Sequence, residues 1–401
     1  MITIQDIRDA HDRIADSICL TPCLESIALS ELTGSRVFVK FDNKQRTGSF
    51  KERGARNALL LLTSEQKQRG VIAASAGNHA LGMAYHGGLL GVPVTVIMPI
   101  AAPLIKISTC ESMGARVILH GRSFDEARDH ALDIAARENL RYINGFNDPE
   151  IIAGQGTIGL ELLSQVPEMD AVIVPIGGGG LVAGTATAIH ASRPEVAIYG
   201  VQSAHAPGYN ASLSSPAPVA VETRPTLADG LCVSVMGDLA FSIARQHVRK
   251  TVEVTEDEIA LAILRAVEKE KEVVEGAGAA GLAALLAGKL PELRGRTVVL
   301  LFCGGNIDPL VLGRVIDKGL AADGRLARFR TKVIDRPGGL ADLSRLIADE
   351  GANIIEIYHD RTFSGPDVFA VRVVCTVETR GADHLARLRN ALAAAGYPMV
   401  L

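Results

Sequence analysis

One lysine in this sequence stands where covalent chemistry is plausible. Lys51 lies among small residues in the segment Gln45–Ala55, directly after the aromatic residue Phe50. A nucleophilic amine needs a lowered pKa, which partial burial and a helix N-terminus both favour. An aromatic neighbour such as Phe50 can support a flat ring. Taken alone, the segment could also be a surface lysine beside an exposed Glu-Arg pair.

A run of four glycines directly follows the apolar run 172–176, which predicts a buried strand. They are Gly177, Gly178, Gly179 and Gly180. Successive glycine N–H groups can converge on one phosphate, and the dipole of a following helix adds to the attraction. A dinucleotide fingerprint is the competing interpretation. A dinucleotide site also needs an acid at the end of the next strand to bind a ribose hydroxyl, and here that strand ends in Gln202. A single phosphate is therefore the better ligand.

A compact polar turn follows the apolar run Val71–Ala74. Its residues are Ser75, Ala76, Gly77, Asn78 and His79. A hydroxyl, an amide and backbone N–H groups suit a substrate carboxylate, and Asn78 could also reach a phenolic oxygen. By itself the turn could equally be an ordinary helix cap. Similarly, Cys303 ends another apolar run and alone would be interpreted as a core thiol.

The elements that must position these residues are short apolar runs that alternate with amphipathic stretches up to about residue 320. This alternation predicts a parallel α/β sheet with both faces covered by helices. In such sheets ligands bind at the carboxyl ends of the strands, so chemistry is expected in the loops described above. The clearest runs are Val94–Pro99, Val117–Leu119, Ala171–Ile176, Ala197–Val201 and Thr297–Cys303.

Together these motifs resemble the fold-type II pyridoxal-phosphate enzymes, in the branch of the serine and threonine dehydratases. The resemblance covers roughly residues 5 to 320 and also rests on Thr21-Pro22, the segment 152–157, Ala228-Asp229-Gly230 and Gly304-Gly305-Asn306. It implies a tryptophan synthase β-like catalytic domain over residues 1–320, made of two parallel α/β subdomains. The smaller subdomain, about 42–145, is inserted in the larger one.

The resemblance also implies pyridoxal 5'-phosphate as the cofactor and a role for each motif. Lys51 attaches the cofactor and removes the α-proton, Phe50 and Asn78 contact its ring, and Gly177 to Gly180 hold its phosphate. The turn Ser75, Ala76, Gly77, Asn78 and His79 receives the substrate carboxylate. Cys303 lies beside the pyridine nitrogen and Glu275 near the ring, although Glu275 could also be an ordinary helix-terminal acid.

The implied reaction is the dehydration and deamination of L-threonine to 2-oxobutyrate and ammonia, and of L-serine to pyruvate. Serine racemase, 3-hydroxyaspartate dehydratase and a catalytically silent amino-acid sensor are the alternatives. Ala76 stands where the related racemases place a second serine as base, so racemisation is disfavoured. Gln202 stands where those relatives place a metal-binding acid, so no metal site is expected.

A second unit follows a predicted linker at 321–326. Residues 327–401 have a βαββαβ order typical of a small ferredoxin-like domain. The stretches Val333–Leu340 and Gly351–Ile354 resemble an ACT domain, which implies a regulatory site for an amino-acid effector. A domain that only mediates oligomer contacts is the alternative. We expect a homo-oligomer, either a dimer or a tetramer.

Composition limits the partners of the chain. Charged residues are 21% of the 401 residues and the net charge is −4, so no basic field would attract nucleic acid or an anionic membrane. The N-terminal segment mixes charged and apolar residues, which predicts neither a signal peptide nor an anchor, and therefore a cytoplasmic protein. The six cysteines form no Cys-x-x-Cys pair, which argues against structural zinc and a disulfide framework.

Overall fold

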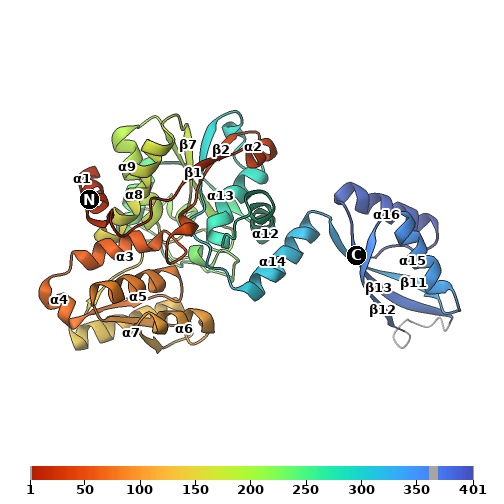
Figure 1. Cartoon of the computed structure of the whole chain (residues 1–401), viewed down its shortest axis with the longest axis horizontal. Helices are drawn as coiled ribbons and strands as arrows, with labels where there is room; N and C mark the ends of the chain where they lie inside the picture. The colour runs from red at the N-terminus through yellow and green to blue at the C-terminus, as the bar shows by residue number, and fades with distance from the viewer. Residues whose placement is uncertain (1, 361–368, 401) are drawn as a thin grey trace. The chain divides into compact units, whose positions relative to one another are not determined.

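The computed structural model describes residues 2–360 and 369–400. The chain forms two compact units, Met1–Ile307 and Asp308–Leu401, and each is described by itself. The first unit contains two sheets and the second contains one (Figure 1). In the described part of the chain, none of the helices combines the length and the apolar character that a membrane span requires.

The larger sheet of the first unit has six strands in the order β1-β2-β10-β7-β8-β9. Every neighbouring pair is parallel except β1 and β2. The predicted parallel sheet is therefore confirmed, with an antiparallel edge strand that the sequence patterns did not indicate. The strands are β1 (Cys23–Ser26), β2 (Arg36–Lys40), β7 (Ala171–Pro175), β8 (Ala197–Ser203), β9 (Val248–Val254) and β10 (Thr297–Leu301).

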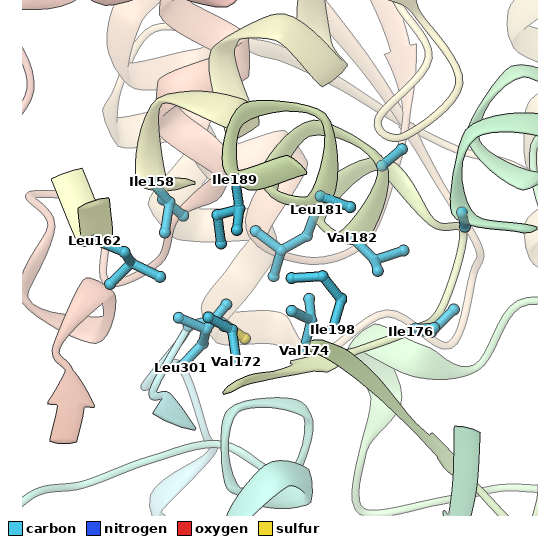
Figure 2. Close-up of a cluster of buried hydrophobic side chains, with 14 of the residues drawn as sticks. Ile158, Leu162, Val172, Val174, Ile176, Leu181, Val182, Ile189, Ile198 and Leu301 are labelled. Carbon is cyan, nitrogen blue, oxygen red and sulfur yellow. The ribbon is translucent and has the colours of Figure 1, made fainter. Parts of the chain in front are cut away.

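Helices cover both faces of this sheet. Helices α8 (Pro149–Gln165) and α9 (Gly180–Ser192) pack on one face, where Ile158, Leu162 and Ile189 meet strand residues such as Val172 (Figure 2). The two helix backbones approach closely at Gly184. A Cβ added there would lie 2.3 Å from the Ile152 carbonyl oxygen. Other helices are α1 (Ile4–Ile14), α2 (Ile27–Thr33), α10 (Gly208–Ser212), α11 (Asp238–His247), α12 (Glu256–Arg265) and α13 (Gly276–Leu286).

The smaller sheet has four parallel strands in the order β5-β4-β3-β6. Figure 1 shows its helices, in orange tones, gathered around it. Its elements are α3 (Lys51–Leu60), α4 (Ser64–Arg69), β3 (Val71–Ala74), α5 (Asn78–Leu90), β4 (Val94–Met98), α6 (Leu104–Ser112), β5 (Arg116–Leu119), α7 (Phe124–Glu138) and β6 (Arg141–Tyr142). The predicted strands at 71–74, 94–99 and 117–119 are thus present within one or two residues of their expected bounds.

The second unit has an antiparallel three-stranded sheet in the order β11-β13-β12. Its elements are α14 (Pro309–Ala322), β11 (Leu326–Ile334), α15 (Gly339–Asp349), β12 (Asn353–Asp360), β13 (Ala370–Glu378) and α16 (Ala382–Ala394). The fourth strand of the predicted βαββαβ order is reduced to a single bridge between Arg330 and Val400. Alternate residues of β11 are buried, so one face of the sheet packs on the helices.

Candidate active site

A cavity of about 290 Å³ lies in the first unit, where β3, β7 and β10 end. Loops from both sheets contribute to its lining, as expected at the carboxyl ends of parallel strands. Every candidate residue identified in the sequence lines this cavity. These residues are Phe50, Lys51, Ser75, Ala76, Gly77, Asn78, His79, Gly177, Gly178, Gly179, Gly180, Glu275 and Cys303.

Lys51 is the first residue of helix α3. The residue before it is anchored to the end of β10, because the Phe50 N–H donates to the Cys303 carbonyl oxygen at 2.9 Å. A bridge between Ser49 and Gly304 extends this pairing. The Lys51 Nζ donates to the Gly145 carbonyl oxygen at 2.6 Å. The amine is therefore held between loops of the two sheets.

Burial lowers the pKa of Lys51 to about 8, although Cys303 and Glu275 act in the opposite direction. A charged amine loses favourable hydration when it is buried, so the neutral form gains. A neutral amine is the nucleophilic and basic form of lysine. The cavity thus contains an amine that is much more reactive near neutral pH than an exposed lysine would be.

Packing leaves no room for side chains in the glycine loop that joins β7 to α9. Gly179 has φ +94°, and a Cβ there would lie 2.1 Å from Cε of Met236. A Cβ at Gly178 would lie 2.2 Å from the Phe146 ring. Gly179 is the N-cap of α9 and no side chain caps the helix. Because the first N–H groups of a helix have no partner within it, the loop offers free donors to an anion.

The polar turn leads from β3 into α5, and Gly77 is the N-cap of that helix. The Ser75 hydroxyl accepts from the Gly77 N–H at 3.2 Å. Asn78 donates to Glu275 Oε1 at 2.7 Å and accepts from the Asn306 amide at 2.8 Å. The Asn78 amide is therefore fixed in orientation by two partners.

His79 is buried and neutral. Burial, together with the nearby Lys51, lowers its pKa to about 3. Its Nε2 lies 3.2 Å from the Ile143 carbonyl oxygen, which assigns the proton to Nε2. Its Nδ1 is buried without a partner among the described residues. The ring can therefore position the turn but carries no positive charge.

Glu275 and Cys303 also line the cavity. Glu275 is the N-cap of α13, and burial, together with the nearby Asp229, raises its pKa to about 7. Its position is compatible with both interpretations of Glu275, since it lies at the start of a helix and also lines the cavity. Burial raises the pKa of the Cys303 thiol well above its usual range, so the thiol stays protonated.

Sequence reasoning missed a buried network of four charges beside Lys51. Arg53 contacts Asp42 at 2.7 Å and Glu161 at 2.5 Å, and Lys40 contacts the same Glu161 at 2.5 Å. The network connects α3 to β2 and α8, so it fixes the helix that begins with Lys51. A buried arginine two residues after the lysine could not be distinguished from a surface one by pattern alone.

Two further lining residues were assigned no role from the sequence. Lys106 lies on α6 and Asp229 in the short turn Asp229–Leu231, and their charged groups are 3.1 Å apart. Within residues 2–360 and 369–400 there is no group of three or more His, Cys, Asp or Glu side chains that could hold a metal ion. The Gln202 amide donates to two backbone carbonyl groups, those of Ile176 and Ala206.

Residues 14–304 match the family model described as pyridoxal-phosphate dependent enzyme, and residues 327–394 match the ACT domain. The chain belongs to the pyridoxal-phosphate-dependent enzymes. It is 43% identical over 397 residues to an L-threonine ammonia-lyase of Thermotoga maritima, covering 99% of this chain and 98% of the relative. It is also 44% identical to a catabolic L-threonine dehydratase of Escherichia coli K12 over 308 residues, 77% of this chain and 94% of the relative.

The fold of this chain is also similar to solved structures of threonine deaminase and serine racemase. A processed threonine deaminase isoform 2 from Solanum lycopersicum superposes with a TM-score of 0.75 and 35% identity, covering 78% of this chain and 87% of that one. Maize serine racemase superposes with a TM-score of 0.75 and 32% identity, covering 80% and 98%. The fold-type II architecture expected from the motifs is confirmed for this pyridoxal-phosphate-dependent enzyme.

Proposed function

We propose that this pyridoxal-phosphate-dependent enzyme is a threonine ammonia-lyase, a carbon–nitrogen lyase. It converts L-threonine to 2-oxobutyrate and ammonia, and L-serine to pyruvate and ammonia. The observation that carries the proposal is one cavity that brings together a low-pKa lysine, a glycine loop and a polar turn. Relatives named L-threonine ammonia-lyase and matching nearly the whole chain support it.

The residues of the cavity fit pyridoxal 5'-phosphate. Lys51 offers the amine for covalent attachment, and the loop Gly177–Gly180 offers free N–H groups for the phosphate. We assign Phe50 and Asn78 to the ring, Cys303 to the pyridine nitrogen and Glu275 to the ring edge. When bound, this cofactor withdraws electrons from the substrate and so makes its α-proton acidic.

Lys51 is then the group that moves the α-proton. Its lowered pKa leaves a substantial neutral fraction near pH 7 to 8, and the neutral amine accepts a proton. The protonated thiol of Cys303 places no negative charge near the ring nitrogen, since burial keeps its pKa high. A neutral neighbour favours expulsion of the β-hydroxyl over a long-lived carbanion.

The polar turn receives the substrate carboxylate. Ser75 supplies a hydroxyl, and Gly77 and Asn78 lie at the N-terminus of α5, where free N–H groups and the helix dipole favour an anion. The orientation of Asn78 is fixed by Glu275 and Asn306, so it is preorganised to bind. A positioned carboxylate places the α-carbon near the Lys51 amine, which turns proton transfer into a step within one complex.

Ala76 argues against racemisation in this cavity. Racemisation needs a second acid–base group on the opposite face of the substrate, and an alanine side chain cannot exchange a proton. Release of ammonia from threonine, serine and 3-hydroxyaspartate, together with assay of D-serine formation, tests the proposal. Threonine should give the highest kcat/KM, and D-serine should not accumulate. An absorption band of bound cofactor without turnover of any of the three amino acids would instead favour an amino-acid sensor.

We propose that the ACT domain binds a branched-chain amino acid and regulates the enzyme. Such a ligand changes activity only if it binds two states of the enzyme unequally. The turn between β11 and α15 contains Gly338 at φ +90°, which exposes backbone groups at the start of a helix. Titration of the full-length enzyme with isoleucine and valine is the test. Removal of residues 327–401 should abolish the response and retain threonine deamination.

The proposed function extends to the oligomeric state of the enzyme and to its location in the cell. We propose a homo-oligomer, a dimer or tetramer, which sedimentation at several protein concentrations would establish. We also propose a cytoplasmic enzyme, since all six cysteines are free, as is usual in a reducing compartment. Fractionation of the native cells followed by immunodetection tests the location.

A further inference from the structure

The ion pair of Lys106 and Asp229 lies in the wall of the active-site cavity and takes no part in the mechanism above. The Lys106 Nζ and the Asp229 Oδ2 are 3.1 Å apart, and both residues line the cavity. Lys106 belongs to α6, which is part of the smaller sheet and its helices. Asp229 lies in the turn Asp229–Leu231, which is part of the larger sheet and its helices. The pair therefore bridges the two parts of the first unit across the cavity.

The two partners differ in their access to water. The Lys106 side chain is 13% exposed and the Asp229 side chain is 60% exposed. Among the described residues that line the cavity, Lys51 and Lys106 supply the positive charges, because His79 is neutral. Lys51 is needed for proton transfer, so Lys106 is the remaining positive charge of this lining. Asp229 forms an ion pair with it.

Negative charge also lies close to this pair. Besides burial, Asp229 raises the pKa of Glu275, and Lys106 lowers it, so the three groups act on one another electrostatically. Both residues line the same cavity of about 290 Å³, so a charged group on a substrate side chain would lie close to the pair. Such a carboxylate would meet the negative charge of Asp229 and an ammonium that is already paired.

We propose that Lys106 and Asp229 select substrates by the charge of their side chain, accepting neutral hydroxy-amino acids and rejecting those with a β-carboxylate. This inference rests on the proposed function and names its substrate class. Asp229 compensates the Lys106 charge and repels a second carboxylate. Without Asp229, the ammonium of Lys106 would be available to bind an acidic side chain such as that of 3-hydroxyaspartate.

Asp229→Asn tests the proposal, and its exposure means that the substitution disturbs little packing. The ratio of kcat/KM for 3-hydroxyaspartate to that for threonine should rise about tenfold or more over the wild type, because one repulsive charge is removed and one attractive charge is released. The rise should shrink at high salt, which screens exposed charges. An unchanged ratio would overturn the proposal.

Lys106→Gln and the double variant are the matched controls. If the released ammonium binds the acid, the gain of Asp229→Asn should disappear when Lys106→Gln is added. A gain that persists in the double variant would assign the effect to another group and refute the role of Lys106. A merely structural pair would lower turnover of both substrates without changing their ratio.

Equilibrium binding separates this inference from the proposed function. Calorimetry of succinate binding to the holoenzyme needs no turnover, and Asp229→Asn should bind succinate about tenfold more tightly, with no such gain for butyrate. If the wild type fails to deaminate threonine, the proposed function is wrong while the succinate result still reports on the pair. Equal succinate affinity in the wild type and Asp229→Asn would refute the charge selection itself.

Discussion

The glycine loop and the polar turn have the same architecture and opposite constraints. Both follow a parallel strand, both lead into the N-terminus of a helix, and both line one cavity. A Cβ added at Gly178 or Gly179 would lie 2.2 Å or 2.1 Å from protein atoms, whereas one added at Gly77 would meet nothing within 4 Å. Protein atoms therefore leave no room for a side chain in the glycine loop, whereas Gly77 of the polar turn has open space beside it.

Removal of the Lys51 amine, which lines the same cavity as the two loops, should have the largest effect. Lys51→Ala should reduce kcat by about a thousandfold or more, because it removes the group that moves the α-proton, while both loops remain intact. Single-turnover and steady-state ammonia release measure the loss. Circular dichroism should show an unchanged fold, and calorimetry should show that phosphate still binds. Activity close to that of the wild type would refute the assignment of Lys51.

Substitution in the glycine loop should affect both binding and folding. Gly179→Val forces a branched side chain into φ +94° and against Met236, so we expect about hundredfold weaker cofactor retention and a loss of roughly 1–3 kcal/mol in the free energy of unfolding. Absorbance titration with the cofactor and urea unfolding measure the two effects. If this variant retained the cofactor as tightly as the parent, the loop would not be the phosphate site.

The pH dependence of cofactor attachment should report the pKa of the buried Lys51 amine. Since the pKa of Lys51 is lowered to about 8, the neutral amine fraction rises with pH and then saturates. The rate of attachment to cofactor-free protein should rise about tenfold per pH unit below this pKa and level off above it. Stopped-flow absorbance measures the rate.

Glu275→Gln is the control for this pH profile. Glu275 raises the pKa of Lys51, so its neutralisation should move the profile to lower pH. A rate that still rises steeply at pH 10 in the wild type would show an ordinary lysine. A profile that Glu275→Gln moves to higher pH would show that the carboxylate does not act on the amine as described.

Substitution in the polar turn should have the smallest effect on folding. Gly77→Ala projects a methyl group into open space, so the free energy of unfolding should change by less than about 1 kcal/mol. The KM for threonine should rise several-fold, since the methyl group approaches the carboxylate site. Urea unfolding and steady-state kinetics measure the two quantities. A loss of stability equal to that of Gly179→Val would remove the distinction between the two loops.

The sequence was sufficient to locate the strands and the loops that form the cavity. Runs such as Val71–Ala74 and 172–176 are apolar because both faces of a parallel strand are covered, so they are visible without tertiary information. The segments that follow them contain the glycines and the polar turn. All of these segments line one cavity in the structure.

Features that depend on distant partners could not be predicted. The short strand Cys23–Ser26 is assigned its antiparallel place by pairing with β2 rather than by its own residues. Asp229 and Lys106 are 123 residues apart in the chain, so no local pattern connects them. Buried charges such as Arg53 are exceptions to the usual exposure of their type, and only their partners show why burial is tolerated.

The place of β10 in the larger sheet also has a consequence for biosynthesis. This strand, Thr297–Leu301, lies between β2 and β7, which are far earlier in the chain. The ribosome therefore releases β2 and β7 before the strand that joins them exists, and at roughly 5–20 residues per second this interval is on the order of ten seconds. The smaller sheet is complete once Tyr142 has emerged. A nascent chain stalled before residue 297 should hold a folded smaller sheet beside two unpaired strand edges, the state most in need of a chaperone.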